Sequence, residues 1–441
     1  MDSCWMPKLR PRHFESGTRA LTYCRCQGQL MRAMTGAVAF GIVVLLGTVV
    51  GFGLTGGVSD GSELGATWTS DTGRQVSANH HAVAVADSGV YAPISDDRDG
   101  SCALISMGVA DGETRWTYDI PPENCTIHAV ADPTVTDIDG DGRAEVLAAT
   151  TEKEVAVFDA PSGDIETRLE LSDYGYTQPI VADLAPATGR EIIAVDVTGT
   201  VFVFGSDGET LWTARLDEYV WAQPAVEDFD GDDNPELLVG GRSGDAVLFG
   251  PDGRVEWNTT VSEMGSITWG THGQADEDPA LEGIFATTSG SVVGVDGRSG
   301  AVEWRTTVGE FAAVRAFGDG DGDGAPEVYV SAQDGRVHAL DAATGEIEWT
   351  TEVVVDRVQM MPPPNLGDLD GDGSTELLAA GNDGSVTVLD PATGDILSSY
   401  ARDVQIFTHA TIADSDDDGA DEAYVIYADG RVVRLEYERP N

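Results

Sequence analysis

Short apolar runs separated by turns rich in Gly, Asp and Asn follow one another from residue 81 to the end of the chain. The segment SAQDGRVHALD, residues 331–341, shows the pattern, with a turn of small residues leading into a short strand. About four such runs fall within each stretch of about 45 residues, and outside residues 37–54 no segment has helical periodicity. The pattern predicts an all-β protein built from short strands.

An acidic loop recurs within this strand pattern. Its clearest copy, DIDGDGRAEVLAA at residues 137–149, places three carboxylates on alternate positions ahead of a glutamate and an apolar strand. The first positions of the seven copies, 45 to 49 residues apart, are Asp137, Asp183, Asp228, Gln274, Asp319, Asp368 and Asp414. Isolated acidic turns would not keep such a period, so the spacing indicates a repeat architecture.

A tryptophan recurs in phase with the acidic loop. It follows a Gly-containing turn, as in TGEIEW, and the copies place Trp116, Trp212, Trp257, Trp304 and Trp349 at one equivalent position. Thr167 and Ser398 occupy this position in two further copies. Four short strands in about 45 residues are typical of one blade of a β-propeller.

The repeats predict an eight-bladed β-propeller over residues 80–441. Residues 81–116 have the blade pattern without the acidic loop, and seven loop-bearing units follow; seven blades is the alternative if 81–116 is incomplete. The last unit lacks an outer strand. Residues 58–79, which contain Trp68, are expected to link the propeller to what precedes it and to supply that strand, thereby removing an exposed sheet edge.

Five of the acidic loops have the donor pattern of calcium sites. Calcium takes six to eight oxygen ligands, several of them charged. Positions 1, 3 and 5 are carboxylates and position 9 is glutamate, whereas position 7 varies freely, as suits a backbone carbonyl ligand. Position 6 is glycine or aspartate, which suggests a positive φ. The predicted ligands are Asp137, Asp139, Asp141, Arg143, Glu145, Asp228, Asp230, Asp232, Asn234, Glu236, Asp319, Asp321, Asp323, Ala325, Glu327, Asp368, Asp370, Asp372, Ser374, Glu376, Asp414, Asp416, Asp418, Ala420 and Glu422.

The alternative is that these loops are solvated turns, but that interpretation predicts no constant spacing between carboxylates and glycines. Magnesium would resist a cage made only of protein ligands, so calcium is the expected ion, at about five sites. The copy at Gln274 keeps Asp276, Asp278 and Glu282, and weak binding is expected there. The copy at Asp183 has alanine at two carboxylate positions and is not expected to bind.

The turn-and-tryptophan element resembles the docking repeat of PQQ-like propellers, the quinoprotein alcohol dehydrogenase superfamily. The acidic loops are similar to the calcium loops of FG-GAP/VCBS repeats in integrin-type propellers. Together the two resemblances cover roughly residues 62–440. They imply either a quinoprotein enzyme, with its cofactor in the central channel, or one of the binding and assembly propellers that lack it. Because this chain has minimal blades and no adjacent cysteine pair, no PQQ is expected.

The charge of the chain restricts its partners and its milieu. The 441 residues carry 76 acidic and 25 basic side chains, for a net charge of -51. Such a charge excludes nucleic acid as a partner and is tolerable where salt screens it. With only two lysines, Lys8 and Lys153, the composition resembles that of haloarchaeal proteins. An ordinary acidic secreted protein is the alternative.

The N-terminal region predicts a membrane anchor. Residues 1–34 form a basic tail, expected to be disordered, although Met31 or Met34 is an alternative start. Residues 37–54, within a predicted anchor at 35–57, are an uncharged and mostly apolar run of 18. At about 1.5 Å per residue this run just spans a bilayer core. The positive-inside rule places the propeller outside the cytoplasm. A cleaved signal peptide is the alternative.

Two features of the exported part bear on its chemistry. Cys102 and Cys125 either form a disulfide or remain two buried thiols. The residues just before the innermost strands occupy one equivalent position and either line the mouth of a channel or cap the strands; they are Asp132, Gln178, Gln223, Trp269 and His409. His80, His81 and His409 either form a cluster near the point where the ring closes or have satisfied roles at the surface.

No catalytic residue stands out in these patterns. We expect a membrane-anchored, extracytoplasmic, calcium-binding propeller that acts in adhesion or envelope assembly, with a protein or glycan as its ligand. The alternatives are a propeller enzyme, either a polysaccharide lyase or a quinoprotein dehydrogenase.

Overall fold

The computed structural model describes residues 63–438 apart from 75, 97–99, 186–188, 263–264 and 356–357. The predicted tail at 1–34 and the predicted anchor at 35–57 lie outside the described residues. Within the part of the chain that the structure describes, no helix is long and apolar enough to cross a membrane.

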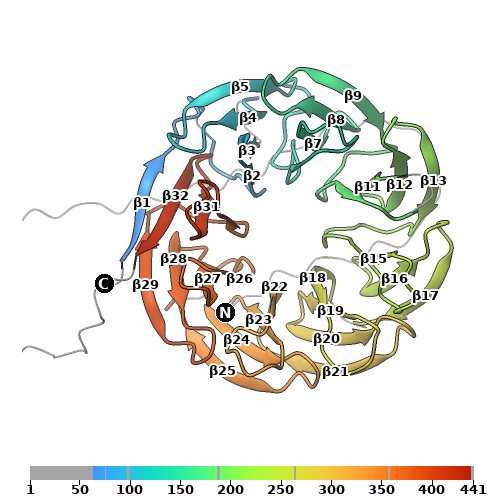
Figure 1. Cartoon of the computed structure of the whole chain (residues 1–441), viewed down its shortest axis with the longest axis vertical. Helices are drawn as coiled ribbons and strands as arrows, with labels where there is room; N and C mark the ends of the chain where they lie inside the picture. The colour runs from blue at the N-terminus through green and yellow to red at the C-terminus, as the bar shows by residue number, and fades with distance from the viewer. Residues whose placement is uncertain are drawn as a thin grey trace, which may run out of the picture. The chain divides into compact units, whose positions relative to one another are not determined.

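The described residues form 32 strands, arranged as eight four-stranded antiparallel sheets that follow one another in a ring (Figure 1). The innermost strands are β2 (Ala84–Ala86), β6 (Thr134–Thr136), β10 (Ile180–Ala182), β14 (Ala225–Glu227), β18 (Ile267–Gly273), β22 (Ala313–Gly318), β26 (Asn365–Gly367) and β30 (Thr411–Ala413). The second strands are β3 (Gly89–Ile94), β7 (Glu145–Thr150), β11 (Glu191–Val195), β15 (Glu236–Gly240), β19 (Glu282–Thr287), β23 (Glu327–Ser331), β27 (Glu376–Ala380) and β31 (Glu422–Ile426).

The third strands are β4 (Ala103–Met107), β8 (Glu154–Asp159), β12 (Thr200–Gly205), β16 (Asp245–Phe249), β20 (Ser291–Asp296), β24 (Arg336–Asp341), β28 (Ser385–Leu389) and β32 (Val432–Glu438). The outermost strands are β5 (Thr114–Asp119), β9 (Ile165–Glu170), β13 (Thr210–Arg215), β17 (Val255–Thr260), β21 (Val302–Thr307), β25 (Ile347–Glu352), β29 (Ile396–Ala401) and β1 (Glu63–Thr69). The prediction of eight blades is therefore confirmed, and the alternative of seven is wrong.

The ring closes where its two ends meet. β1 pairs antiparallel with β32, from Glu63 opposite Glu438 to Thr69 opposite Val433, and so supplies the outer strand that the last repeat lacks. The strand expected from the segment around Trp68 is confirmed. Without β1, the third strand β32 would be an unpaired edge, and an unpaired edge is the hazard of an open β structure.

The core of the propeller lies between adjacent blades. Second strands are buried along their whole length, as in β7, whereas outer strands such as β13 and β17 combine exposed and half-buried residues. One apolar cluster joins Leu147 and Val157 of one blade to Ile192 and Phe204 of the next. Continuous apolar runs thus form the middle strands because both of their faces are covered.

The recurrent tryptophans hold neighbouring blades together. The Trp257 indole N–H donates to the carbonyl of Gly297, 2.6 Å away in the next blade, and the Gly300 backbone lies against the ring. A Cβ on Gly300 would lie 2.7 Å from a ring carbon, and its φ of +69° already favours glycine. The same indole–carbonyl bond, 2.8 to 3.0 Å long, is made by Trp68, Trp116, Trp212, Trp304 and Trp349.

Candidate functional site

The propeller has two functionally different faces. In each antiparallel blade the connection from first to second strand and the turn from third to fourth strand leave the sheet at the same end. The acidic loops and the tryptophan-docking turns therefore share one face, the acidic face. The remaining connections form the opposite face, called here the mouth face, where the channel opens.

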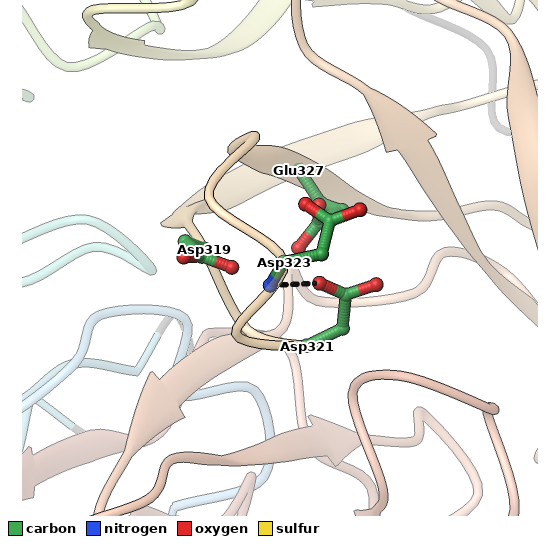
Figure 2. Close-up of side chains that lie close together, drawn as sticks. All are labelled: Asp319, Asp321, Asp323 and Glu327. Carbon is green, nitrogen blue, oxygen red and sulfur yellow. Dashed lines mark hydrogen bonds between the residues drawn. The ribbon is translucent and has the colours of Figure 1, made fainter.

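The structure brings the predicted carboxylates of the acidic loops together. In Figure 2 the side chains of Asp319, Asp321, Asp323 and Glu327 converge, and one oxygen from each lies within 4.8 Å of the others. Among the other groups of described residues that meet this distance are Asp137, Asp139 and Glu145; Asp228, Asp230 and Asp232; Asp276, Asp278 and Glu282; and Asp368, Asp370 and Glu376. The weaker copy at Gln274 is thus organised like the complete ones.

The first carboxylate of each loop organises its backbone. The amides of Gly140 and Gly142 donate to the two oxygens of Asp137 at 2.7 and 2.9 Å, and these glycines have φ values of +80° and +87°. The expected positive φ at position 6 is confirmed, also at Asp233, where φ is +71°. Position 4 has a positive φ as well, which the sequence pattern did not indicate; in the last loop Asp417 adopts it, at +59°.

The glutamate at position 9 clamps the loop. In all seven copies one of its oxygens accepts a hydrogen bond of 2.6 to 3.1 Å from the amide at position 2. These glutamates, none more than 5% exposed, are Glu145, Glu191, Glu236, Glu282, Glu327, Glu376 and Glu422. The sequence analysis predicted only a metal-binding role for this glutamate. Its structural role was indicated by Glu191, a position-9 glutamate that is kept in the copy with alanine at two of the carboxylate positions.

The electrostatics of the loops favour a bound cation. Burial raises the pKa of Glu236, Glu282 and Glu327 to about 7, and neighbouring aspartates add to the shift. In addition, Asp230 Oδ1 and Glu282 Oε1 are buried and accept no hydrogen bond from the described residues. Leaving a buried polar oxygen unsatisfied is costly. A divalent ion among these oxygens would remove both penalties, so the residues fit calcium.

The last acidic loop holds a cation of the chain itself. Arg434, on β32, has a guanidinium 2.8 Å from Asp416 Oδ2 and 3.0 Å from Glu422 Oε1, and it also contacts Glu436. Its side chain is only 8% exposed. Sequence reasoning missed this residue, although an arginine between the apolar residues Val433 and Leu435 was the available signal. The metal predicted for this loop would have to compete with Arg434.

On the mouth face the five predicted residues of the ring line one cavity of about 400 Å³; they are Asp132, Gln178, Gln223, Trp269 and His409. Residues that sequence reasoning missed contribute Tyr176, Trp221, Phe311, Arg315 and Phe407. Their signal was weak, because the four aromatic residues lie in connections of irregular length and Arg315 is a single charged residue on innermost strand β22. The cavity is thus lined by aromatic rings, amides and one guanidinium.

Several of these polar side chains also join blades, as the capping alternative predicted. Gln178 N–H donates to the Gln223 side-chain oxygen at 2.8 Å, and the Gln223 amide donates back to the Gln178 carbonyl at 2.8 Å. Asp132 accepts from the amide of Ala82 at 2.9 Å and pairs with His81 at 2.8 Å. Burial raises the pKa of Asp132, but His81 outweighs it and holds this pKa below its usual range.

The histidines expected to cluster do lie at the mouth face, with an additional member. His80 and His81 line the cavity, and His128, which sequence reasoning missed, lies against both with ring centroids 5.2 and 5.3 Å away. His409 instead packs edge-on against Trp269. Burial, followed by the neighbouring Arg315, lowers the pKa of His409 to about 3.

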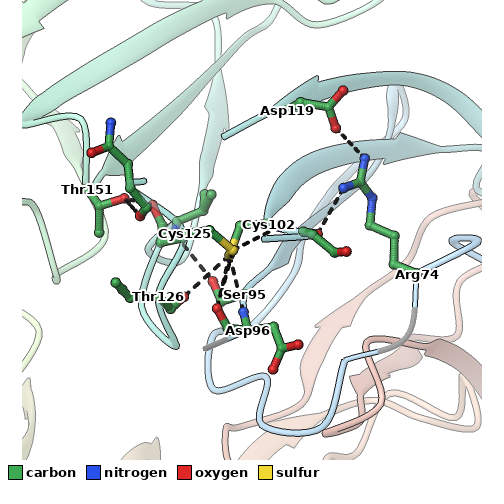
Figure 3. The surroundings of a disulfide bond; sticks show 12 residues. Arg74, Ser95, Asp96, Cys102, Asp119, Cys125, Thr126 and Thr151 are labelled. Carbon is green, nitrogen blue, oxygen red and sulfur yellow. Dashed lines mark hydrogen bonds and ion pairs between the residues drawn. A yellow bond between two sulfur atoms is a disulfide. The ribbon is translucent and has the colours of Figure 1, made fainter. Parts of the chain in front are cut away.

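Cys102 and Cys125 form a disulfide, with Cα atoms 5.4 Å apart (Figure 3). The bond ties the start of β4 to the connection that carries His128 and Asp132. Of the two alternatives, the disulfide is therefore the one in the structure. It secures one side of the mouth face.

The closed ring of eight four-stranded sheets, joined by docking tryptophans, defines an eight-bladed β-propeller. Residues 288–438 match the family model PQQ_2, described as outer membrane protein assembly factor BamB. This match confirms the predicted PQQ-like resemblance, whereas the FG-GAP/VCBS resemblance and the haloarchaeal origin stay predictions. A search of curated proteins gave no match.

Solved structures share this fold at low sequence identity. BamB from Moraxella catarrhalis has a TM-score of 0.60 and 19% identity, with 86% of this chain and 99% of that chain covered. The computationally designed Ika8 protein has a TM-score of 0.63 and 14% identity, with 84% and 99% covered. The quinohemoprotein alcohol dehydrogenase ADHIIG from Pseudomonas putida HK5 has a TM-score of 0.60 and 11% identity, with 86% and 77% covered.

Proposed function

We propose that this protein is a membrane-anchored, extracytoplasmic propeller that binds protein partners in the cell envelope and acts in envelope assembly. The observation that carries the proposal is the aromatic, amide-lined cavity at the mouth face. A role in assembly is supported by the family match, whose description names an assembly factor.

The cavity and its surroundings suit a peptide segment. Trp221, Trp269 and Arg315 line it, and tryptophan and arginine are enriched among residues that dominate binding energies. Phe311, which also lines the cavity, has a side chain that is 44% exposed. A concave surface lined by aromatic rings together with a few polar groups is typical of a surface that a partner covers.

The hydrogen bonds that the polar side chains of the cavity already make favour a role in binding over a role in catalysis. Gln178, Gln223 and Asp132 all hold neighbouring segments together, and Asp132 is kept ionised by its two hydrogen-bond donors. Side chains committed in this way provide a rigid surface. A general base or acid would need an adjustable protonation state near the working pH.

Site-specific photocrosslinking in intact cells tests this function. A photoreactive residue at Phe311 should give a discrete adduct with an envelope protein, and Trp269→Ala should abolish that adduct. The same probe at Val255, an exposed residue on outer strand β17, is the matched control. If both positions gave the same adducts, or if Trp269→Ala changed nothing, the proposed binding surface would be wrong. A bound chromophore absorbing beyond the protein band would indicate a quinoprotein instead.

We also propose that calcium occupies the loops at 137, 228, 319 and 368, where aspartates and the position-9 glutamate would hold it. Bound calcium would offset carboxylate repulsion and link stability to ion concentration. In concentrated salt, chelator should lower the melting temperature and calcium should restore it. Asp319→Asn should reduce the number of ions bound by one, whereas the matched control Asp334→Asn, in a turn on the mouth face, should not. An unchanged melting temperature with chelator would reject calcium binding.

The membrane anchor at residues 35–57 is part of the same proposal. Intact cells treated with an external protease should lose the propeller, while membranes washed at high salt should retain the uncleaved protein. Release of the full-length protein by washing would contradict the anchor.

A further inference from the structure

The mouth face carries a cluster of three imidazoles that is separate from the acidic loops. His80 and His81 precede β2, and His128 lies in the connection from β5 to β6, three residues after the disulfide-bonded Cys125. The His80 and His128 rings are 5.2 Å apart between centroids, and those of His81 and His128 are 5.3 Å apart. Two segments of the chain are thus held together with their ring edges adjacent.

The protonation of His81 follows from its neighbours. Asp132 Oδ1 accepts from the amide of Ala82 at 2.9 Å and lies 2.8 Å from His81 Nδ1. An ionised carboxylate can only accept, so Nδ1 of His81 carries the proton. A neutral His81 then presents an unprotonated Nε2 on the opposite side of its ring. A carboxylate that orients a histidine in this way is the usual outer partner of a metal-bound imidazole.

That Nε2 atom points at a second nitrogen. It lies 3.2 Å from Nδ1 of His128. Two nitrogens bound to one tetrahedral Zn²⁺ at about 2.0–2.1 Å would lie about 3.3 Å apart, so the observed separation matches one edge of such a site. The ring nitrogens of His80 make no hydrogen bond to another described residue, which leaves them available as ligands.

We propose that His80, His81 and His128 bind a divalent transition-metal ion of the zinc class at the mouth face, with Asp132 as the residue that positions His81. Imidazole nitrogen selects zinc, copper or nickel, whereas calcium prefers the oxygen-rich loops of the acidic face. Because His80 and His81 line the cavity, a fourth ligand would enter from the cavity. A metal at this place would give the partner-binding surface a coordination point for a donor group of the bound ligand.

An imidazole–imidazole hydrogen bond is the other reading of the 3.2 Å separation.

Metal titration of the full-length protein separates the two readings. Millimolar calcium would first saturate the oxygen-rich loops, and Zn²⁺ would then be titrated by calorimetry, with Co²⁺ used in parallel for its visible absorption. The expected result is one Zn²⁺ per chain. His128→Gln and His80→Gln should each weaken its binding at least 100-fold, and Asp132→Asn by about 10–100-fold.

The matched control is His272→Gln. His272 is a histidine of the same channel, partly exposed and 3.7 Å from Glu227, and its replacement should leave zinc affinity unchanged within twofold. Circular dichroism without metal would verify that each variant is folded. His80 and His128 are less buried than His81, so their variants carry the test if His81→Gln fails to fold.

Absence of stoichiometric zinc binding, or a His128→Gln variant that binds as the wild type does, would overturn the proposal and leave a hydrogen bond between the two rings. This outcome is independent of the proposed function, because zinc binding needs neither calcium in the loops nor a protein partner.

Discussion

Replacement of Arg434 by methionine should destabilise the propeller strongly and free its last acidic loop. Arg434 and Glu422 are 8% and 3% exposed at the side chain, and their charged atoms are 3.0 Å apart. Removing one member of such a buried pair leaves the other uncompensated, at a cost of about 3–5 kcal/mol. The pairs with Asp416 and Glu436, whose side chains are 48% and 37% exposed, should each add less than about 1 kcal/mol. Urea unfolding of Arg434→Met in chelator should therefore show a loss of about 3–5 kcal/mol.

Calcium should recover part of this loss. Without the guanidinium, Asp414, Asp416, Asp418 and Glu422 form a free loop of the same pattern as the other four. Ion binding to the folded state stabilises it by about 2.7 kcal/mol at 100 times the dissociation constant. The variant should then bind one more calcium ion than the wild type, as measured by calorimetry.

Two variants make the test specific. Arg402→Met removes a partly buried arginine that pairs with Asp429 on the mouth face, and it should change neither calcium stoichiometry nor calcium rescue. Arg434→Met combined with Glu422→Gln should be more stable in chelator than Arg434→Met alone, because no buried charge remains unpaired. A loss below about 1 kcal/mol in Arg434→Met, or strictly additive effects in the double variant, would refute the reasoning.

Three further predictions concern the disulfide, a docking turn and the mouth face. Cys102→Ser removes the disulfide, which closes a loop with a sequence separation of 23, and should lower the free energy of unfolding by about 3 kcal/mol. Equal free energies of unfolding for the oxidised and the reduced wild type would contradict this prediction. Gly300→Ala should lower the free energy of unfolding in urea by at least about 1 kcal/mol more than Gly73→Ala does. Both glycines have a positive φ, but only a Cβ on Gly300 would meet the Trp257 ring. Equal losses in the two variants would exclude the ring contact. Burial, followed by Arg315, lowers the pKa of His409 to about 3, and Asp132 and His81 are the other titratable groups that face it. The unfolded chain therefore binds more protons than the folded chain between pH 6.5 and about 3, and stability falls as pH falls through this window. His409→Gln should flatten that dependence by up to about 1.4 kcal/mol per pH unit, and an unchanged slope would contradict the buried neutral imidazole.

The features that repeat locally could be predicted from the sequence. The strand pattern, the spacing of the acidic loops and the tryptophans led to eight blades, and the missing outer strand led to closure by the segment around Trp68. These inferences succeeded because alternation, turn chemistry and repeat length are properties of short segments. The positive φ at Gly142 could be predicted for the same reason, since it depends on the residues of a single turn.

The sites where different blades meet could not be predicted in this way. The reciprocal bonds of Gln178 and Gln223, the pair of His81 with Asp132, and the approach of His128 to His81 all join segments that lie apart in the chain. Their meeting depends on the order and tilt of the sheets and on the closure of the ring. The sequence by itself thus determined the blades and the chemistry of their loops. Only the tertiary structure decided which charges are compensated and which imidazoles face each other, because those contacts require distant backbones to be brought within a few ångströms.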